Sequence, residues 1–400
     1  MGKNSTLSNS KINEILERGV EEIIGRESLI KKLVSGEILR IKLGIDPTAP
    51  ILHLGNAVPL WKLRQFQELG HQIVLIIGDF TAQIGDTSDK TAIRQPLTKE
   101  QIEKNMKEYK RQIGKILDFK KTEYIYNSTW LSELSFKEVL KLSSQFTVAQ
   151  MLERENFTER YKVGKPIGLQ EFLYPLMQGY DSVAVKADVE IGGTDQIFNL
   201  LAGRIIQKAY GQSPQNVIAL TLIEGTDGQK MSKSLGNIIG ITDNPRDMFG
   251  KVMSMSDDLI IKYFLLCTRL PLEEIKKIEE DLKSKKLNPR DTKARLAKEI
   301  VTLYHGQKIA EFAEEEFNRI FKEKKLPIKI LTMEISEDNL NISDLLTKIR
   351  LTSSKSEAKR LILQGGVKIN GKVQKNWKEI IKIKKDTIIQ VGKRKFVKLK

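Results

Sequence analysis

The sequence predicts an α/β protein organised around a doubly wound parallel sheet, as its apolar runs and the turns between them indicate. Residues 38–43 and 73–77 are short, apolar-rich runs of the kind that form buried parallel strands, and residues 59–69 between them have helical periodicity. A strand, a helix and a strand within about 40 residues make one nucleotide-binding half of a Rossmann-like fold. Ligands are therefore expected beyond the carboxyl ends of these strands.

The composition fits two or three domains with no membrane anchor. The chain has 400 residues, 40% of them hydrophobic, and lacks an apolar run of about 18 residues. Residues 1–10 are polar and lack the apolar core of a secretory signal, so we expect a cytoplasmic protein. The single cysteine, Cys267, follows two leucines and fits core packing in a reducing compartment. With three histidines and that one thiol, no metal site is expected.

The positive charge is concentrated at the C-terminal end. The formal net charge is +16, and residues 341–400 hold 17 Lys and Arg against 4 Asp and Glu. The other 340 residues carry 50 basic against 47 acidic side chains and are nearly neutral. A basic excess confined to one segment is typical of a surface that binds a polyanion, and without an amphipathic anchor nucleic acid is favoured over a membrane.

We predict three folded regions and one linker. Residues 1–245 form the sheet domain, beginning with helices over 11–35. A mainly helical insertion at about 98–144, with a strand-like run at 123–126, is expected to carry a homodimer interface. Residues 246–326 are predicted to be a helical domain and 327–341 a linker, and residues 342–400 a small α+β module.

The turn after the first strand has the features of a phosphate-binding site. It reads Gly-Ile-Asp-Pro-Thr-Ala-Pro-Ile-Leu-His-Leu-Gly-Asn over 44–56 and precedes a helix. Backbone N–H groups and the helix dipole favour anions there, His53 can donate to a phosphate oxygen, and Gly55 leaves room for a flat purine. By itself this pattern is equally that of an ordinary loop in which His53 caps a helix.

A second motif supplies mobile positive charge. Lys230-Met231-Ser232-Lys233-Ser234 lies between glycines, and its two ammonium groups suit a departing pyrophosphate. Alone it could be a solvated basic turn. Together, in this order and roughly 180 residues apart, the two stretches resemble the HIGH and KMSKS motifs of the class I aminoacyl-tRNA synthetases.

Two further stretches are predicted to face a ligand. In the helix expected at 168–181, Tyr174, Gln178 and Asp181 share one face, and apolar neighbours indicate that this helix is buried, so Asp181 needs a partner. Residues 191–196 (Ile-Gly-Gly-Thr-Asp-Gln) then open another helix. There Asp195 is either an N-cap or a ligand for a ribose hydroxyl.

The last segment reads as a helix, a glycine stop and short strands. Residues 356–362 are helical in pattern, and the Asn370-Gly371 pair predicts a tight hairpin. This arrangement resembles the small RNA-binding module that a ribosomal small-subunit protein shares with several RNA-modifying enzymes. The expected RNA contacts are Lys355, Lys359, Arg360, Gly365 and Gly366.

Nearly the whole chain resembles the bacterial tyrosyl-tRNA synthetases that end in this module. The match rests on residues 44–56, 171–181 (Glu-Phe-Leu-Tyr-Pro-Leu-Met-Gln-Gly-Tyr-Asp), 191–196 and 230–234. The resemblance implies a homodimer that activates L-tyrosine with ATP, releases pyrophosphate, and transfers tyrosine to the 3′ end of tRNA(Tyr). Mg²⁺ would accompany ATP, and no tightly bound cofactor is implied.

The resemblance also assigns roles in tyrosine binding. Asp181 would accept a hydrogen bond from the substrate phenol, while Tyr174 and Gln178 would hold the α-amino group. Asp86 would lie beside that ammonium and Gln196 near the carboxylate.

For ATP, the resemblance implies a nucleotide-binding set and a catalytic set. Asp195 would bind the ribose, and the other nucleotide-binding residues would be Gly44, Asp46, His53, Gly55, Gly193 and Lys233. Thr48 and His53 would meet the transferring phosphate, and Lys230 and Lys233 the pyrophosphate. The remaining catalytic residue would be Asn56.

Three positions depart from the family pattern. Asn56 stands where histidine is commoner, although its amide can still donate to a ribose. Lys42 stands where most tyrosyl enzymes place a tyrosine that bonds the phenol, which leaves its own contact with the phenol open. Residues 86–90 read Asp-Thr-Ser-Asp-Lys in place of Asp-Pro-Ser-Gly-Lys. Two alternatives remain: another adenylyl-transferring enzyme with an H-x-G-H loop, and a synthetase-like RNA-binding protein without catalysis.

Overall fold

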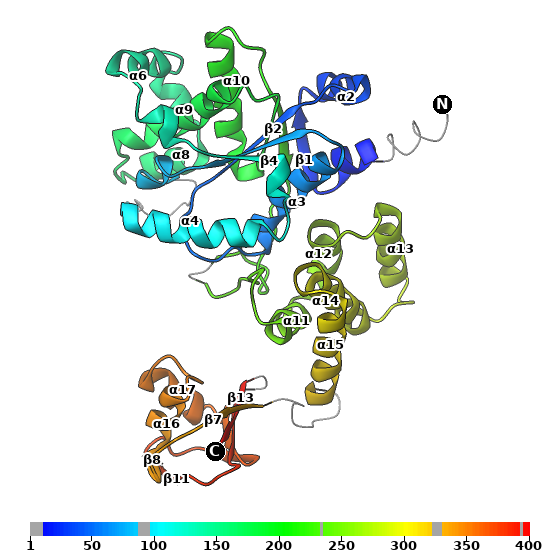
Figure 1. Cartoon of the computed structure of the whole chain (residues 1–400), viewed down its shortest axis with the longest axis vertical. Coiled ribbons are helices and arrows are strands. Elements are labelled where there is room, and N and C mark those ends of the chain that lie inside the picture. The colour runs from blue at the N-terminus through cyan, green and yellow to red at the C-terminus, as the bar shows by residue number, and fades with distance from the viewer. Residues whose placement is uncertain (1–10, 87–96, 233–234, 322–329, 393–394) are drawn as a thin grey trace. The chain divides into compact units, whose positions relative to one another are not determined.

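The computed structural model describes residues 11–86, 97–232, 235–321, 330–392 and 395–400 (Figure 1). The chain divides into two compact units, residues 1–243 with 254–296 and residues 244–253 with 297–400. In the described part of the chain, no helix combines the length and the apolar character that crossing a membrane requires.

A six-stranded, mostly parallel sheet forms the centre of the first unit, which confirms the predicted fold class. Its strand order is β1-β6-β5-β2-β3-β4, and all neighbours are parallel except β1 and β6. The inner strands are almost wholly buried because helices cover a doubly wound sheet. The strands are β1 Val20–Ile24, β2 Arg40–Ile45, β3 Gln72–Ile77, β4 Thr122–Tyr126, β5 Val189–Gly193 and β6 Asn216–Leu220.

Helices connect these strands. Helix α9 (Leu169–Ala184) runs without a break through Pro175 and packs against α10 (Ile197–Ala209). Gly179 permits this approach, since a Cβ there would lie 2.6 Å from Ile206 Cδ1. The remaining helices of the unit are residues 11–17, α2 Arg26–Ser35, α3 Leu54–Glu68, α4 Lys99–Ile113, α5 Ser128–Leu131, α6 Phe136–Ser143, α7 Val148–Leu152, α8 Glu155–Lys162, α12 Ile260–Cys267 and α13 Leu272–Lys283.

Two segments of the sheet differ from the prediction. Val20–Ile24 is the antiparallel edge strand β1, not helix, because its backbone pairs with β6. Thr122–Tyr126 is the opposite edge strand, parallel to β3, so the predicted insertion at 98–144 contains part of the main sheet. Its alternation of aromatic and other residues suits an edge strand.

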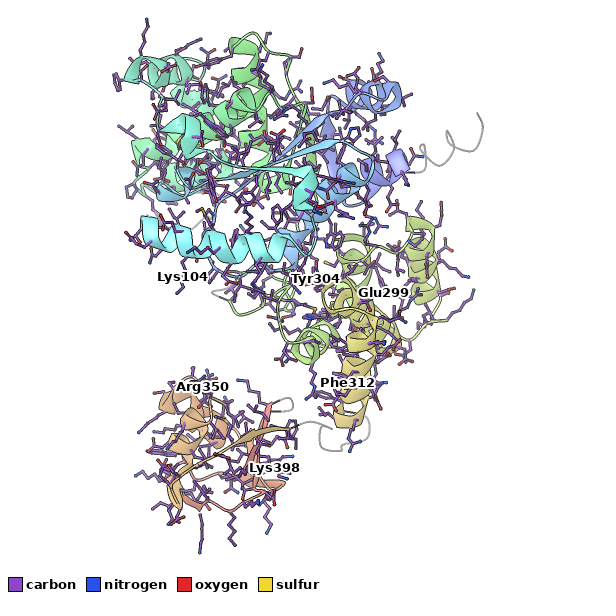
Figure 2. All side chains as sticks on the ribbon, viewed as in Figure 1. Lys104, Glu299, Tyr304, Phe312, Arg350 and Lys398 are labelled. Carbon is purple, nitrogen blue, oxygen red and sulfur yellow. The ribbon has the colours of Figure 1, made fainter. Side chains whose placement is uncertain are left out.

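Helices and a small α+β module make up the second unit. In the helical part, the guanidinium of Arg246 lies 5.3 Å from the ring centre of Phe312 (labelled in Figure 2) and 3.2 Å from the buried Glu316 carboxylate. The helices are α11 (Pro245–Ser254, of which residues 245–253 belong to this unit), α14 (Pro289–His305, from residue 297) and α15 (Gln307–Phe321).

The module has its own apolar core. Helices α16 (Ile342–Lys348) and α17 (Lys355–Leu363) supply Leu345, Leu346 and Ile362 to it. The predicted hairpin is present, with positive φ at both Asn370 and Gly371. Two sheets, ordered β10-β9-β12-β13-β7 and β11-β8, complete the module. Their strands are β7 Leu331–Met333, β8 Asn339–Asn341, β9 Val367–Ile369, β10 Lys372–Gln374, β11 Ile380–Lys382, β12 Ile388–Val391 and β13 Lys395–Leu399.

The predicted linker at 327–341 is wrong over its described part. Leu331–Met333 pairs in parallel with β13, and Asn339–Asn341 pairs with β11. Both strands belong to the module sheets, so the module begins before residue 342. Three-residue strands are too short to show periodicity in the sequence, which is why this region resembled a linker.

Candidate active site

Backbone pairing brings the two sequence motifs of the first unit together. The Leu54 N–H donates to the carbonyl of Ile239 at 2.9 Å, and the Ile241 N–H donates to the carbonyl of Leu52 at 3.0 Å. His53 and Gly240 form an antiparallel bridge between these bonds. The chain that leaves the lysine motif therefore runs beside the start of α3, and the expected pairing of the motifs in one site has a structural basis.

The start of α3 has the geometry expected of an anion-binding helix end. His53 is the N-cap residue, and its backbone N–H donates to Asn56 Oδ1 at 3.2 Å. The Asn56 oxygen thus stabilises the helix start and leaves its amide nitrogen as the group for a ligand. A Cβ on Gly55 would lie 3.1 Å from His53 Nδ1, so glycine keeps space beside the imidazole.

Gly44 lies near the end of β2, and Thr48 lies in the turn between β2 and α3. Gly44 is exposed, and no heavy atom of the described residues comes within 4 Å of where its Cβ would be, which leaves a flat backbone surface. The Thr48 N–H donates to the carbonyl of Asp46 at 2.8 Å and closes the turn.

One asparagine organises the stem of the lysine loop. The Asn237 amide donates to Asp227 Oδ1 at 2.8 Å and to the Lys230 carbonyl at 3.0 Å, and its oxygen accepts from the Ser232 N–H at 2.8 Å. Lys230 is exposed beyond this stem, whereas Lys233 lies outside the described residues. A fixed stem with an exposed lysine beyond it suits a side chain that interacts with the negative charge of a leaving group only during reaction.

Asp46 is held by two hydroxyl donors. Tyr174 Oη donates to Asp46 Oδ2 at 2.9 Å, and Thr81 Oγ1 donates to Asp46 Oδ1 at 2.7 Å. A Cβ on Gly78 would lie 1.9 Å from Asp46 Oδ1, so only glycine fits there. Asp46, which is predicted to line the nucleotide, therefore also holds Tyr174, which is predicted to bind tyrosine.

Asp86 is held between a guanidinium and an amide. Arg154 Nη2 lies 2.6 Å from Asp86 Oδ1, and Gln196 Nε2 donates to Asp86 Oδ2 at 2.8 Å. Asn199 in turn donates to Gln196 Oε1 at 2.9 Å. Asp86 and Gln196, which lie 110 residues apart in sequence, are thus joined directly.

Asp181 lies on the buried face of α9, as predicted, and is 3% exposed. Trp130 Nε1 donates to Asp181 Oδ1 at 2.8 Å, and Asn127 Nδ2 donates to Asp181 Oδ2 at 3.4 Å. Burial raises the carboxyl pKa to about 7, against the lowering influence of Lys42 and of these two donors. Burial also raises the pKa of the neighbouring Tyr174 well above its usual value, so this phenol stays protonated.

Lys42 is fully buried at the floor of the same region. Its ammonium lies 2.8 Å from Glu190 Oε1 and donates to the carbonyl of Gln178 at 2.8 Å and to Ser182 Oγ at 2.7 Å. The Lys42 ammonium is therefore held by three oxygen atoms of the protein.

Gly193 and Asp195 lie at the end of β5 and the start of the next helical turn. Asp195 is exposed, and a Cβ on Gly193 would approach its Oδ1 to 2.6 Å. The pair thus forms a close turn at the carboxyl edge of the sheet, where a ribose can be bound. In the described residues, no three His, Cys, Asp or Glu side chains form a group that could hold a metal ion.

Residues that the sequence reasoning missed are mostly donors to these carboxylates. They are Thr81, Asn127, Trp130, Arg154 and Glu190. Glu190 could have been found from the sequence, because a charged residue inside the apolar strand 189–193 needs a partner. Lys42 is likewise a charged residue inside an apolar strand, β2. The other four stand in no recognisable pattern.

The predicted RNA contacts lie on α17 and the turn after it, in the second unit. Lys355, Lys359 and Arg360 are exposed, and the Lys359 ammonium lies 4.3 Å from the ring centre of Trp377. Gly365 has a φ of +69°, which favours glycine, and Gly366 begins the chain toward β9. Further basic side chains, such as Arg350 and Lys398, lie on the same module (Figure 2).

Comparison with known proteins relates almost the whole chain to one family. Residues 35–322 match the family described as tRNA synthetases class I (W and Y), and residues 319–399 match a Tyrosine--tRNA ligase SYY-like C-terminal domain. A tyrosine–tRNA ligase of Carboxydothermus hydrogenoformans is 51% identical over 397 residues, with 96% of this chain and 97% of that protein covered. One of Thermotoga maritima is 51% identical over 387 residues, with 96% of each covered.

A solved structure shares the fold. The tyrosyl-tRNA synthetase of Archaeoglobus fulgidus complexed with L-tyrosine has a TM-score of 0.63 and 23% sequence identity. The match covers 77% of this chain and 99% of that one.

Replacing Asp181 by asparagine should stabilise the protein more at pH 8 than at pH 5. The carboxyl pKa rises from 3.8 to about 7 on folding, chiefly through burial, so stability falls as pH rises between these values and the full cost is present above about 7. The asparagine side chain keeps an oxygen that can accept a hydrogen bond from Trp130, and it carries no buried charge. Thermal unfolding at both pH values measures the gain, on the order of a few kcal/mol at pH 8.

Glu68→Gln is the matched control in the same unit. Despite partial burial, hydrogen bonds from Arg269 and Arg64 hold the Glu68 pKa below its usual value, so both pH values lie above it. Its effect should be nearly equal at pH 5 and pH 8, and an equal effect for Asp181→Asn would contradict the assigned pKa.

Proposed function

Because this chain belongs to the tyrosine–tRNA ligases of the class I tRNA synthetases, we propose that its first unit activates L-tyrosine with ATP and that the chain charges tRNA(Tyr). The observation that carries the assignment of the site is the buried face of α9. This helix carries Tyr174, Gln178 and Asp181, and the bond from Tyr174 Oη to Asp46 links it to the first motif, which supports one site for both.

The tyrosine-binding residues act by orientation. Asp181 accepts a hydrogen bond from the substrate phenol, and its raised pKa makes this acceptor strongest above about pH 7. Tyr174, Gln178 and Asp86 surround the α-amino group, and Gln196 lies toward the carboxylate. Since Asp86 and Gln196 are already bonded to each other, this half of the site is formed before substrate arrives.

The first reaction step needs no protein nucleophile. An oxygen of the tyrosine carboxylate attacks the α-phosphorus of ATP, which enters as its Mg²⁺ complex, and the bond from that phosphorus to pyrophosphate breaks. Thr48 and His53 stabilise the transferring phosphate, while Lys230 and Lys233 receive the charge that develops on pyrophosphate. Gly44, Gly55, Gly193, Asp195 and Asn56 hold the nucleoside.

In the second step, a hydroxyl of the terminal ribose of tRNA attacks the tyrosyl carbonyl. The new ester bond forms as the bond between the carboxyl carbon and the phosphate oxygen breaks, and AMP leaves with the electron pair. Both steps therefore depend on positioning and on charge stabilisation.

Pyrophosphate exchange into ATP should depend on tyrosine, and phenylalanine should be nearly inert. Without a hydroxyl the buried Asp181 would lose its substrate partner, and a site built around such a group rejects the shorter analogue strongly. Exchange assays run separately with each of the twenty amino acids measure this. Exchange driven best by tryptophan, or by none of them, would refute the proposed reaction.

Lys230→Ala should slow adenylate formation by roughly 10²–10³-fold while tyrosine affinity changes little. Its charge acts only as pyrophosphate departs, so the loss falls on the chemical step. Rapid-quench rates and tyrosine titration separate the two quantities. Lys208→Ala, an exposed lysine on α10, is the control, and equal rates for both variants would contradict the role of Lys230.

We further propose that the protein is a homodimer whose interface extends from the end of the predicted insertion at 98–144 over an apolar surface on α6–α9. Six large apolar side chains there are between 55% and 80% exposed. Figure 1 shows α6, α8 and α9 at one end of the unit. Such a concentration of exposed apolar surface indicates an interface. The six are Phe136, Leu140, Val148, Tyr161, Val163 and Leu169.

Phe136→Lys combined with Leu169→Asp should therefore convert a dimer into a monomer in sedimentation experiments. Ile38→Asp, which charges an exposed apolar residue outside this surface, is the control and should remain dimeric. A parent protein that sediments as a monomer near 46 kDa at micromolar concentration would contradict the proposal.

The module should supply most of the electrostatic attraction to tRNA. A chain that ends at Phe321, after α15, lacks the segment that holds most of the net charge, so it should still form tyrosyl-adenylate but bind tRNA weakly. Its tRNA affinity should fall less steeply with salt than that of the parent. In the full chain, Lys355→Ala with Arg360→Ala should reduce the salt slope, whereas efficient charging by the shortened chain across a salt series would assign the module another role.

A further inference from the structure

A buried ion pair joins the neighbouring strands β2 and β5 beneath the proposed tyrosine site. Lys42 on β2 and Glu190 on β5 stand opposite each other in the strand register. Their side chains are 0% and 1% exposed, and Nζ lies 2.8 Å from Oε1.

Both members of the pair bond to the same residue of α9. The Lys42 ammonium donates to the carbonyl oxygen of Gln178 at 2.8 Å, and Gln178 Nε2 donates to Glu190 Oε1 at 3.1 Å. Gln178 is therefore held at its main chain by the lysine and at its side chain by the glutamate. The bond from its nitrogen to Glu190 limits the rotamers that the Gln178 amide can adopt.

Two neighbours complete this buried network. Ser182 Oγ accepts from Lys42 at 2.7 Å and donates to Glu190 Oε2 at 3.2 Å. Gln215 Nε2 also donates to Glu190 Oε2. A Cβ on Gly203 would lie 2.5 Å from Gln215 Nε2, so α10 leaves no space for a larger residue over the network.

We propose that Lys42 and Glu190 are positioning residues that set the affinity for the amino-acid substrate by fixing the side-chain amide of Gln178. The proposal rests on the proposed function, in which Gln178 binds the α-amino group of tyrosine. In this proposal Lys42 does not contact the substrate phenol directly, since three protein oxygens already bind its ammonium.

Electrostatics supports a paired arrangement at this place. Lys42 lowers the pKa of the nearby Asp181 and Glu190 raises it, so the two charges act in opposite directions on the phenol acceptor. The other polar groups around Asp181 are Trp130, Asn127 and the phenol of Tyr174. Removing only one member of the pair would leave the influence of the other on Asp181 unopposed.

Stability alone does not account for the pair. Desolvation offsets most of the attraction between two buried charges, and an apolar pair of similar size often stabilises a fold as well or better. The double variant Lys42→Met with Glu190→Met therefore keeps the volume and removes the bonds to Gln178.

The experiment measures KM for tyrosine and for ATP in pyrophosphate exchange, together with thermal unfolding. The double variant should fold, with its stability lowered by the hydrogen bonds that Gln178, Ser182 and Gln215 lose, and should show KM for tyrosine raised roughly 10- to 100-fold, with KM for ATP little changed. Gln178→Ala should raise KM for tyrosine by itself. Adding the double change to Gln178→Ala should raise it little further, because the pair acts through that residue.

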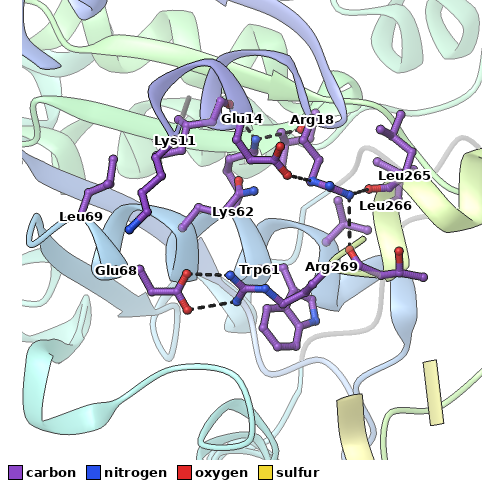
Figure 3. Close-up of a pocket in the computed structure, with 15 residues that line it drawn as sticks. Lys11, Glu14, Arg18, Trp61, Lys62, Glu68, Leu69, Leu265, Leu266 and Arg269 are labelled. Carbon is purple, nitrogen blue, oxygen red and sulfur yellow. Dashed lines mark hydrogen bonds and ion pairs between the residues drawn. The ribbon is translucent and has the colours of Figure 1, made fainter. Parts of the chain in front are cut away.

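Lys62→Met is the matched control. Lys62 is also a buried lysine of the first unit, but its ammonium donates to the carbonyls of Ile15 at 2.7 Å and Arg18 at 2.8 Å. These residues line a pocket between the helix at 11–17, α3 and the end of α12 (Figure 3). The Lys62→Met change should lower the thermal stability and leave KM for tyrosine unchanged.

The outcomes separate the two proposals. A parent without tyrosine-dependent exchange refutes the proposed function. With an active parent, parental KM for tyrosine in the double variant, additive effects with Gln178→Ala, or failure of the double variant to fold where Lys62→Met folds would each overturn the positioning role.

Discussion

Three carboxylates in the site each need hydrogen-bond donors, and the arrangement of the site follows from that need. Asp46, Asp86 and Asp181 all lie in low-exposure surroundings, where a charged group without partners is costly. Each draws its donors from a distant part of the chain: Asp46 from α9 and the turn after β3, Asp86 from Arg154 and Gln196, and Asp181 from Trp130 and Asn127. The fold around the site is therefore cross-linked by the same groups that we propose to bind substrate.

These cross-links make the site preorganised. Tyr174 cannot rotate away without leaving Asp46, and Gln196 is held by Asp86 on one side and Asn199 on the other. Groups fixed before binding need no reordering in the reaction, which suits chemistry that relies on positioning and not on a protein nucleophile. The lysine loop differs in one respect: Asn237 holds its stem, and the Lys230 side chain is exposed.

Sequence patterns pointed to the candidate ligand-binding residues but not to the residues that hold them in place. The glycine turn, the face of α9 and the lysine motif each combine residues close in sequence, so their spacing shows which side chains lie together. Trp130 and Arg154 act on carboxylates 51 and 68 residues away, and no local period connects such pairs. The short strands β7 and β8 were missed for a related reason, because strand pairing over a long separation, not local composition, makes them strands.

Lys42 and Lys62, two buried lysines of the first unit, show why the partner matters as much as burial. Lys62 meets only carbonyl oxygens as hydrogen-bond acceptors, and burial, helped by the nearby Arg18, lowers its pKa to about 7. Lys42 is buried as deeply, but its ammonium lies 2.8 Å from the Glu190 carboxylate and also donates to the carbonyl of Gln178 and to Ser182 Oγ. A buried charge with a charged and hydrogen-bonded partner costs the fold less than one without. The carboxylate on β5 therefore gives the buried lysine on β2 its partner beneath the proposed tyrosine site.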